Sequence, residues 1–164
     1  MQITYLGAEK FEVKTRDAKL ILSDEVDIDD FKISGPGEYE RKGVFIQAIR
    51  PNGGGCIFII NTESMAVCYT GKIREMISDD AVKEIGDIDI LILPLGEEGT
   101  IDIKKASTLI SKIDPRTVIP MLYSDISGFK KMEGIVEEDL DTLKVKKADL
   151  PDEERKFFIL KPRG

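Results

Sequence analysis

The sequence predicts an α/β fold in which a β-rich first half precedes alternating strands and helices. Short apolar or alternating runs, typical of strands, fill the first half at residues 3–6, 11–15, 20–22, 44–49, 56–61 and 65–69. After Gly71 the pattern changes to helix and strand in alternation. A strand meander followed by β-α-β-α-β units favours layered sheets and helices with right-handed parallel crossovers.

Two helices are expected early in the second half. The first covers residues 79–85, where Ser78 can cap the N-terminus and Gly86 can end the helix. The second covers residues 103–113 and ends at Asp114, because a residue that precedes proline avoids helical geometry. Its apolar residues fall on one face at helical spacing: Ala106, Leu109, Ile110 and Ile113.

The remaining segments are expected to add strands and a third helix. A nearly continuous apolar run at 88–93 is typical of a strand that is covered on both faces, and residues 118–121 supply another strand. Short strands are also expected near residues 143–147 and 157–160. The third helix is expected over residues 133–143, with the buried residues Val136, Leu140 and Leu143.

Length and charge predict one domain, residues 1–164, and exclude two kinds of partner. A chain of 164 residues with 41% hydrophobic content can bury one sizeable core but is too short for two ordinary domains. The net charge of -7 repels phosphate backbones and anionic lipid headgroups, so we expect neither nucleic acid nor membranes as partners. No basic segment leads into a long apolar run near Met1, which favours a cytoplasmic protein.

The two cysteines are expected to be buried free thiols, since a reducing compartment leaves them unpaired. Cys68 is the best-placed nucleophile because it precedes the loop at residues 69–72, but its thiolate would need Lys72 or Arg74 beside it. The chain contains no histidine, which excludes Ser-His-Asp and Cys-His catalysis.

Two further motifs are interpreted as loops. The acidic run at residues 24–30 contains an EF-hand register that begins at Asp27, but Phe31 and Lys32 occupy its fifth and sixth places. We therefore expect a solvated loop there. The glycines at 53–55 lack the Lys-Ser/Thr sequence and the helix start of a phosphate-binding loop, so we expect a hairpin turn.

Five ordered blocks carry a resemblance to small prokaryotic metal-dependent hydrolases of the metallo-β-lactamase superfamily. The resemblance covers nearly the whole chain and implies that family's αββα sandwich, here in a shortened form. The blocks are Ile3-Thr4-Tyr5-Leu6-Gly7, Gly35-Pro36-Gly37-Glu38-Tyr39-Glu40 with Gly43-Val44, Gly86-Asp87-Ile88-Asp89-Ile90-Leu91, Pro94-Leu95-Gly96 and Val118-Ile119-Pro120-Met121.

The sequence departs from the family at the metal ligands. Where the family has a Gly-His-Ser turn after its first strand, this chain has Ala8 and Glu9 after the glycine. The family's Gly-Asp, whose carboxylate bridges two metals, is matched by Gly71-Lys72, which places a cation at that point. The histidine of the family's Pro-Met-His-Tyr is matched by Leu122.

The main ligand loop of the family, His-x-His-x-Asp-His, has a helix behind it and should fall between Leu22 and Gly35. This chain has only twelve residues there, without the motif, so we interpret the loop and the helix as deleted. Zinc sites usually need three protein ligands, and without the metal no bound water is activated. The resemblance therefore implies no catalytic residue, no metal ligand and no cofactor. It leaves a vestigial cleft with the residues Ala8, Glu9, Glu38, Gly71, Lys72 and Leu122.

These departures favour a non-catalytic pseudo-hydrolase that acts as a binding or assembly module, as a homo-oligomer or with a protein partner. The physical reason is the missing helix behind the ligand loop. Without it, the outer apolar face of the first sheet would be exposed unless a second copy of the chain covers it. One alternative is a hydrolase with a rebuilt site that uses a hard metal and carboxylates from Asp24, Asp27, Asp29 or Glu38. Another is a sensor of small anions in the cleft around Ala8, Lys72 and Leu122.

Overall fold

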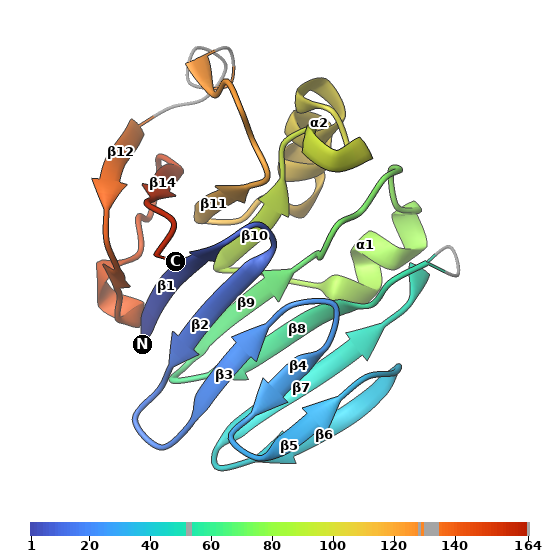
Figure 1. Ribbon diagram of the computed structural model, residues 1–164, viewed down its shortest axis with the longest axis vertical. Coiled ribbons are helices and arrows are strands. Elements are labelled where there is room, and N and C mark those ends of the chain that lie inside the picture. The colour runs from blue at the N-terminus through green and yellow to red at the C-terminus, as the bar shows by residue number, and fades with distance from the viewer. Residues whose placement is uncertain (52–53, 128, 130–134, 164) are drawn as a thin grey trace.

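The structure consists of two β-sheets packed face to face, with two helices on the outer side of the second sheet (Figure 1). The computed structural model describes residues 1–51, 54–127, 129 and 135–163. A β-rich first half is followed by a β-α-β-α-β half, as predicted. The predicted α/β class is therefore confirmed.

The first sheet has six antiparallel strands in the order β13-β1-β2-β3-β4-β5. Its strands are β1 (Gln2–Gly7), β2 (Lys10–Lys14), β3 (Lys19–Leu22), β4 (Val26–Ile28), β5 (Phe31–Ile33) and β13 (Leu143–Lys144). The strands alternate apolar and polar residues, so one face packs against the second sheet and the other faces solvent.

The second sheet has eight strands in the order β12-β14-β11-β10-β9-β8-β7-β6. Its antiparallel strands are β6 (Gly37–Arg41), β7 (Val44–Ile49), β8 (Ile57–Thr62) and β9 (Met65–Tyr69). Its parallel part continues from β9 through β10 (Ile90–Pro94), β11 (Thr117–Met121), β14 (Lys156–Leu160) and β12 (Ile135–Leu140). The turn predicted at residues 51–55 joins the antiparallel pair β7 and β8, although residues 52–53 lie outside the described residues.

The two helices have the predicted bounds, α1 (Asp79–Ile85) and α2 (Ile103–Ile113). The Ser78 side chain accepts a hydrogen bond from the Ala81 N–H at the start of α1, and Asp102 caps α2 in the same way. Short 3-10 helices are η2 (Glu97–Gly99) and η3 (Lys147–Asp149). Within the described part of the chain, no helix has the length and apolar composition needed to cross a membrane.

The core has two layers, one on each side of the second sheet. The first fills the space between the sheets, and the second lies between the second sheet and the helices. Strands β10 and β11 are buried along their whole length because both of their faces are covered. Their carboxyl ends therefore emerge together at one edge of the sandwich.

The outer face of the first sheet is charged rather than apolar. A cross-strand row on this face consists of Thr4, Glu12, Ile21, Asp27 and Lys32. The Glu12 carboxylate forms ion pairs with the ammonium groups of Lys14, at 3.5 Å, and Lys19, at 3.1 Å. The exposed apolar face that motivated the expected homo-oligomer is therefore not found, because strand alternation turns polar residues outward. The homo-oligomer itself stays a prediction.

The third predicted helix is wrong, since residues 135–140 form strand β12 beside β14. Residues 133–134 lie outside the described residues. Val136 and Leu140 are four residues apart, a spacing that fits one side of a helix or one side of a strand. A register shift between Glu137 and Leu140, with Asp139 at a φ of 60°, bends the strand instead.

The acidic segment predicted as a solvated loop forms the hairpin of β4 and β5, which extends the first sheet. Its carboxylates are engaged in ion pairs with nearby lysines. Lys32 contacts Asp27 at 3.4 Å, and Lys42 contacts Asp29 at 2.7 Å. Cross-strand pairing therefore replaces the family's ligand loop in this segment.

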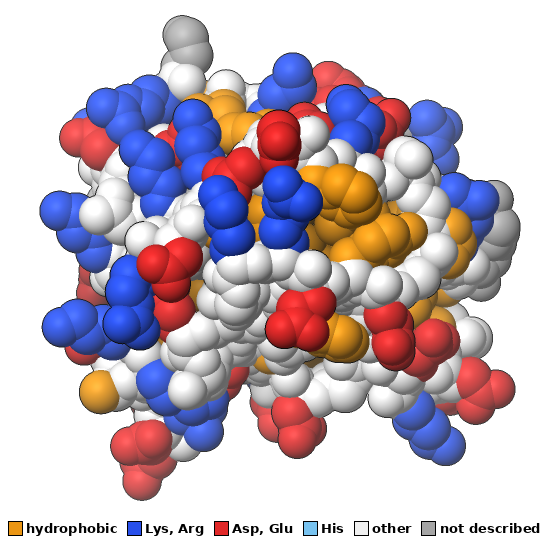
Figure 2. Space-filling model, turned by 90° about the horizontal axis from the view of Figure 1, so that it is seen from below, with side chains coloured by type: hydrophobic (Ala, Val, Ile, Leu, Met, Phe, Trp, Pro, Cys, Tyr) orange, Lys and Arg blue, Asp and Glu red, His pale blue; other side chains and the backbone are white. Residues whose placement is uncertain are grey.

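Both sheets end at the same side of the molecule, in the consecutive strands β5 and β6. Figure 2, which views the molecule from below, shows hydrophobic side chains gathered among basic and acidic ones. Phe31 on β5 and Phe45 on β7 are the large hydrophobic residues that are exposed, at 41% and 38%. The sandwich is thus open along this side.

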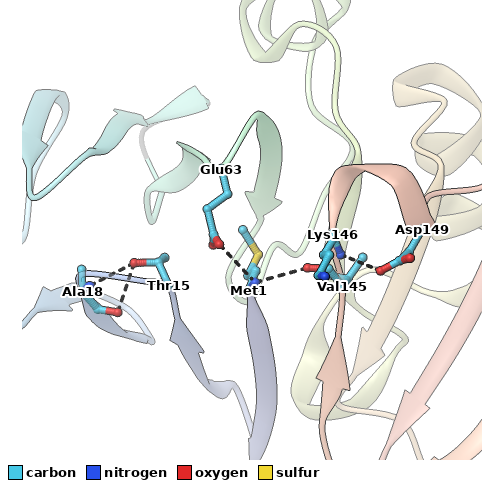
Figure 3. Close-up of polar contacts among 7 residues, drawn as sticks. All are labelled: Met1, Thr15, Ala18, Glu63, Val145, Lys146 and Asp149. Atoms are coloured by element: carbon cyan, nitrogen blue, oxygen red, sulfur yellow. Dashed lines mark hydrogen bonds and ion pairs between the residues drawn. The ribbon is translucent and has the colours of Figure 1, made fainter.

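The opposite side of the first sheet is closed by polar contacts of the first residue (Figure 3). The ammonium group of Met1 pairs with the Glu63 carboxylate at 3.3 Å and donates to the Val145 carbonyl at 3.2 Å. The Lys146 N–H donates to Asp149 within η3, which orders the segment that follows β13. These contacts tie β1 and β13 to the end of β8.

Candidate functional site

The candidate site is the predicted cleft region, where the carboxyl ends of β9, β10 and β11 meet the turn between β1 and β2. The Tyr69 hydroxyl, at the end of β9, donates a hydrogen bond of 2.5 Å to the Glu9 carbonyl. The Glu97 N–H, after β10, donates to the Leu122 carbonyl, after β11, at 3.1 Å. Ligands of α/β proteins commonly bind at the carboxyl ends of parallel strands.

Ala8 and Leu122 have left-handed backbones, with φ of 49° and 51°. Residues with a side chain seldom adopt this region, which costs roughly 1–2 kcal/mol. Both positions are those at which the resemblance places family histidines. Seven other non-glycine residues of the described chain share this backbone region, so the left-handed turns alone do not mark a functional site.

Two tyrosines hold the turn that follows β1. The Tyr5 hydroxyl donates to the Ala8 carbonyl at 2.7 Å, and the Tyr69 hydroxyl donates to the Glu9 carbonyl. Burial raises the pKa of both phenols above the ordinary value, so both remain protonated donors. Neither tyrosine was predicted to have a role. Their positions in strands that end at the predicted cleft were the sequence feature that could have indicated one.

Glu9 and Lys72 form a pair at the mouth of the cleft, with Nζ and Oε1 3.8 Å apart. The Glu9 side chain is 16% exposed and that of Lys72 35%, so solvent reaches both. Lys72 also lines a cavity of about 330 Å³ together with Arg74 and Glu75. The arrangement brings two carboxylates, Glu9 and Glu75, and two cations, Lys72 and Arg74, to the edge of the sheet.

The structure brings together four of the six predicted cleft residues, because the turn after β1 lies beside the end of β9. These four are Ala8, Glu9, Gly71 and Lys72. Leu122, at the end of β11, joins them through the Tyr5 phenol, which contacts its backbone. Glu38 does not belong to this group. It lies on β6 and lines a different cavity with Asp80 and Glu84 of the α1 region.

The carboxylates of the rebuilt-site alternative are dispersed. Asp27 and Asp29 pair with lysines on the first sheet, and Glu38 lies on the edge strand of the second. Only Asp24 is near the cleft, because its charge contributes to the raised pKa of Tyr69. Glu9 was not among the carboxylates of that alternative, although it is the one that faces Lys72.

The described residues do not fit a zinc centre. Among them, no three His, Cys, Asp or Glu side chains lie together in a group that could hold a metal ion. The chain has no histidine, the usual main ligand of zinc in hydrolases.

Cys68 is not a nucleophile in this fold. It is fully buried against the helix layer, and burial raises the pKa of its thiol to about 12. A thiol with that pKa stays protonated at neutral pH and is a poor nucleophile. Cys56 and Cys68 are both free and buried, as predicted.

The fold and the cleft define a metallo-β-lactamase-like protein, and comparison with known proteins agrees. Residues 9–122 match the family described as the beta-lactamase superfamily domain, and the chain belongs to that family. A Zn-dependent hydrolase of the metallo-β-lactamase superfamily from Thermotoga maritima, so assigned provisionally, has the same fold. Its TM-score is 0.84 at 21% identity, with 98% of this chain and 100% of that one covered.

Relatives in archaea carry the name UPF0173 metal-dependent hydrolase. The protein of Methanosarcina barkeri is 29% identical over 105 residues, which cover 64% of this chain and 42% of the relative. That of Archaeoglobus fulgidus is 27% identical over 123 residues, or 75% and 48% of the two chains. The chain thus matches less than half the length of these relatives.

The interpretation of this protein as a non-catalytic binding module is contradicted by these comparisons. The relatives in Methanosarcina barkeri and Archaeoglobus fulgidus are named metal-dependent hydrolases. The inference went wrong because it equated the loss of imidazole ligands with the loss of function.

Proposed function

We propose that the protein is a hydrolase of the metallo-β-lactamase superfamily with a rebuilt carboxylate site at the Glu9–Lys72 pair. The observation that supports this most directly is the position of the pair, 3.8 Å apart, at the strand ends where the resemblance places the family's metal ligands. A carboxylate that solvent reaches only in part can act as a general base. The names of the relatives support the reaction class.

The chemistry assigns one role to each side chain. The Glu9 carboxylate removes a proton from a water molecule while the water oxygen bonds to the carbonyl carbon of an ester. The bond between that carbon and the alcohol oxygen then breaks, and the proton passes from Glu9 to the departing oxygen. The Lys72 ammonium stabilises the negative charge that develops on the carbonyl oxygen, a role that fixed cations perform well in partly dehydrated sites.

The orientation of Glu9 depends on the two tyrosines. The hydrogen bond from Tyr69 to the Glu9 carbonyl fixes the turn that carries the carboxylate. Tyr5 holds the preceding carbonyl, that of Ala8, at 2.7 Å. Both tyrosines are thus positioning residues, because they act through the backbone of the turn and not on the substrate.

Hydrolysis of chromogenic esters and lactones, with and without EDTA, tests this proposal. Glu9→Gln should lower kcat by about 10²–10⁴-fold, the usual contribution of a general base. Glu12→Gln is the matched control, since Glu12 makes the same kind of lysine pair on the outer face of the first sheet. Activity that survives Glu9→Gln, or that EDTA abolishes, would refute the proposed roles.

A second candidate function is the binding of a small anion. Lys72 and Arg74 line the same cavity of about 330 Å³ with one carboxylate, Glu75, and two cations against one acid suit a carboxylate or phosphate group. Thermal-shift measurements with inorganic phosphate and acetate test this candidate, because a bound anion raises the melting temperature. Lys72→Met should remove the shift, whereas Lys112→Met, in an exposed pair on α2, should retain it.

A further inference from the structure

Strand β6 is the last strand of the second sheet, and its outer edge is open. Within the described residues, β6 pairs with β7 alone and has no strand on its other side. Its five residues, Gly37–Arg41, carry no proline that would block pairing. An open edge with free backbone groups can accept an added strand.

The helix-side face of this edge is acidic. Glu38 and Glu40 stand opposite Gln47 and Phe45 of β7, on the face that the helices cover further along. Glu38 also lines a cavity of about 560 Å³ together with Asp80 and Glu84. Both β6 glutamates are exposed, and neither makes an ion pair within the described part of the chain.

The opposite face of the same edge is apolar. Tyr39 stands opposite Ile46, and it contacts Phe31 with ring centroids 6.3 Å apart. These residues line a cavity of about 160 Å³ with Ile28, Ile33 and Val44, and Glu40 of β6 also borders it. Arg41, which also lies here, is neutralised by Asp30 at 2.7 Å and covers the Phe31 ring. The hydrophobic side chains of Figure 2 mark this side of the molecule.

We infer that β6 binds an extended segment of a partner protein in which basic and apolar residues alternate. Side chains of a strand point to opposite faces in turn, so one set would meet Glu38 and Glu40 while the other enters the apolar cavity. Opposite-charge pairs across neighbouring strands stabilise such pairing. The pattern Lys-apolar-Lys-apolar satisfies both faces at once.

A second copy of this chain is a poor occupant of the same edge. Two β6 strands related by a two-fold axis must place residues of the same face opposite each other. Centred on Tyr39, such a pairing puts Glu38 opposite Glu40 twice, and like charges in that position are destabilising. The edge therefore favours a basic partner over itself.

Fluorescence anisotropy with three labelled peptides tests this inference: Thr-Lys-Val-Lys-Val-Lys-Thr, its rearrangement Thr-Lys-Lys-Lys-Val-Val-Thr, and the acidic Thr-Glu-Val-Glu-Val-Glu-Thr. The alternating basic peptide should bind about tenfold more tightly than the rearranged one, since two favourable cross-strand pairs contribute that much. Amide shifts in NMR spectra should concentrate on β6. Equal affinity for both basic peptides, or shifts centred elsewhere, would overturn it.

Charge variants separate strand addition from general attraction to an acidic protein. Glu38→Lys with Glu40→Lys should weaken binding of the alternating basic peptide about tenfold or more, and should create binding of the acidic one. The gain also shows that the variant is folded. Glu153→Lys with Glu154→Lys changes the net charge equally at an exposed loop far along the chain and should leave both affinities unchanged. An equal loss in that control contradicts the inference.

Discussion

Replacing Tyr69 with phenylalanine tests whether the cleft joins the two sheets. The Tyr69 hydroxyl comes from β9 of the second sheet, and the carbonyl that it contacts belongs to Glu9, between β1 and β2 of the first. The ring stays buried in the variant, so the change removes one hydrogen bond and leaves a carbonyl unpaired. Such a loss costs about 1–3 kcal/mol.

For a domain of this size, each kcal/mol corresponds to roughly 2–4 °C in melting temperature. Thermal unfolding followed by circular dichroism should therefore show Tyr69→Phe melting about 2–12 °C below the wild type. Tyr39→Phe is the matched control, because its hydroxyl donates to Gly35 at 2.9 Å from a half-buried position at the open edge. That variant should lose less than about 1 kcal/mol. Equal losses in both variants would refute the role given to the cleft hydrogen bond.

The pH dependence gives an independent check of the same hydrogen bond. Burial raises the pKa of Tyr69 above its ordinary 10.0, so the unfolded chain releases this proton first as the pH rises. The contribution of the phenol to stability is fully present below pH 10 and decreases above it. Stability measured by urea unfolding should therefore fall less steeply above pH 10 in Tyr69→Phe than in the wild type. Parallel curves would contradict the assigned burial.

Two further predictions concern reactivity and assembly. Iodoacetamide at pH 8 should leave Cys68 unmodified in the folded protein and alkylate it in guanidinium, because burial raises its pKa to about 12; peptide mass mapping shows the difference. Early modification of Cys68 would mean that the helix layer does not cover it. Glu38→Lys should promote dimers through β6, raising the association constant about tenfold by turning two like-charge pairs into opposite ones. Sedimentation velocity measures this, and no change would contradict the register argument.

The sequence was sufficient for the elements whose signals are local. Ser78 and Gly86 bound α1, and the apolar face of residues 103–113 defines α2, as predicted. Apolar runs with no alternation identified β10 and β11, which are buried on both faces. In each case a few neighbouring residues determine the structure, so a single sequence contains the information.

Errors arose where distant pairing decides the outcome. Residues 135–140 form a strand because β14 offers them an edge, and Val136 and Leu140 alone do not distinguish a strand from a helix. The acidic segment became a hairpin because β3 pairs with it, through Leu20 and Leu22. Lysines then neutralise its carboxylates, which no count of acidic residues could reveal.

The cleft could be located from the sequence, but its contents could not. Resemblance placed Ala8, Lys72 and Leu122 at former ligand positions, and the structure puts all three at strand ends. The contact of Glu9 with Lys72 depends on the turn after β1 reaching the end of β9, which tertiary packing alone determines. The same packing excludes Glu38, which belongs to a block that carries the resemblance but lies on the far edge of the second sheet.

The charge at the mouth of the cleft constrains what this site can act on. The resemblance places a metal-bridging carboxylate where this chain has Lys72, and the nearest acid, Glu9, already faces that ammonium. A site organised around a bound cation would attract electron-rich substrate atoms through the metal, whereas Lys72 and Arg74 can attract them directly.

Substrates with a carboxylate or phosphate next to the scissile bond should therefore be hydrolysed in preference to neutral ones. Raising the salt concentration should reduce kcat/KM for the charged substrates more than for neutral esters, because solvent-exposed cations are screened. Equal salt dependence for both would show that these two cations do not contact the substrate.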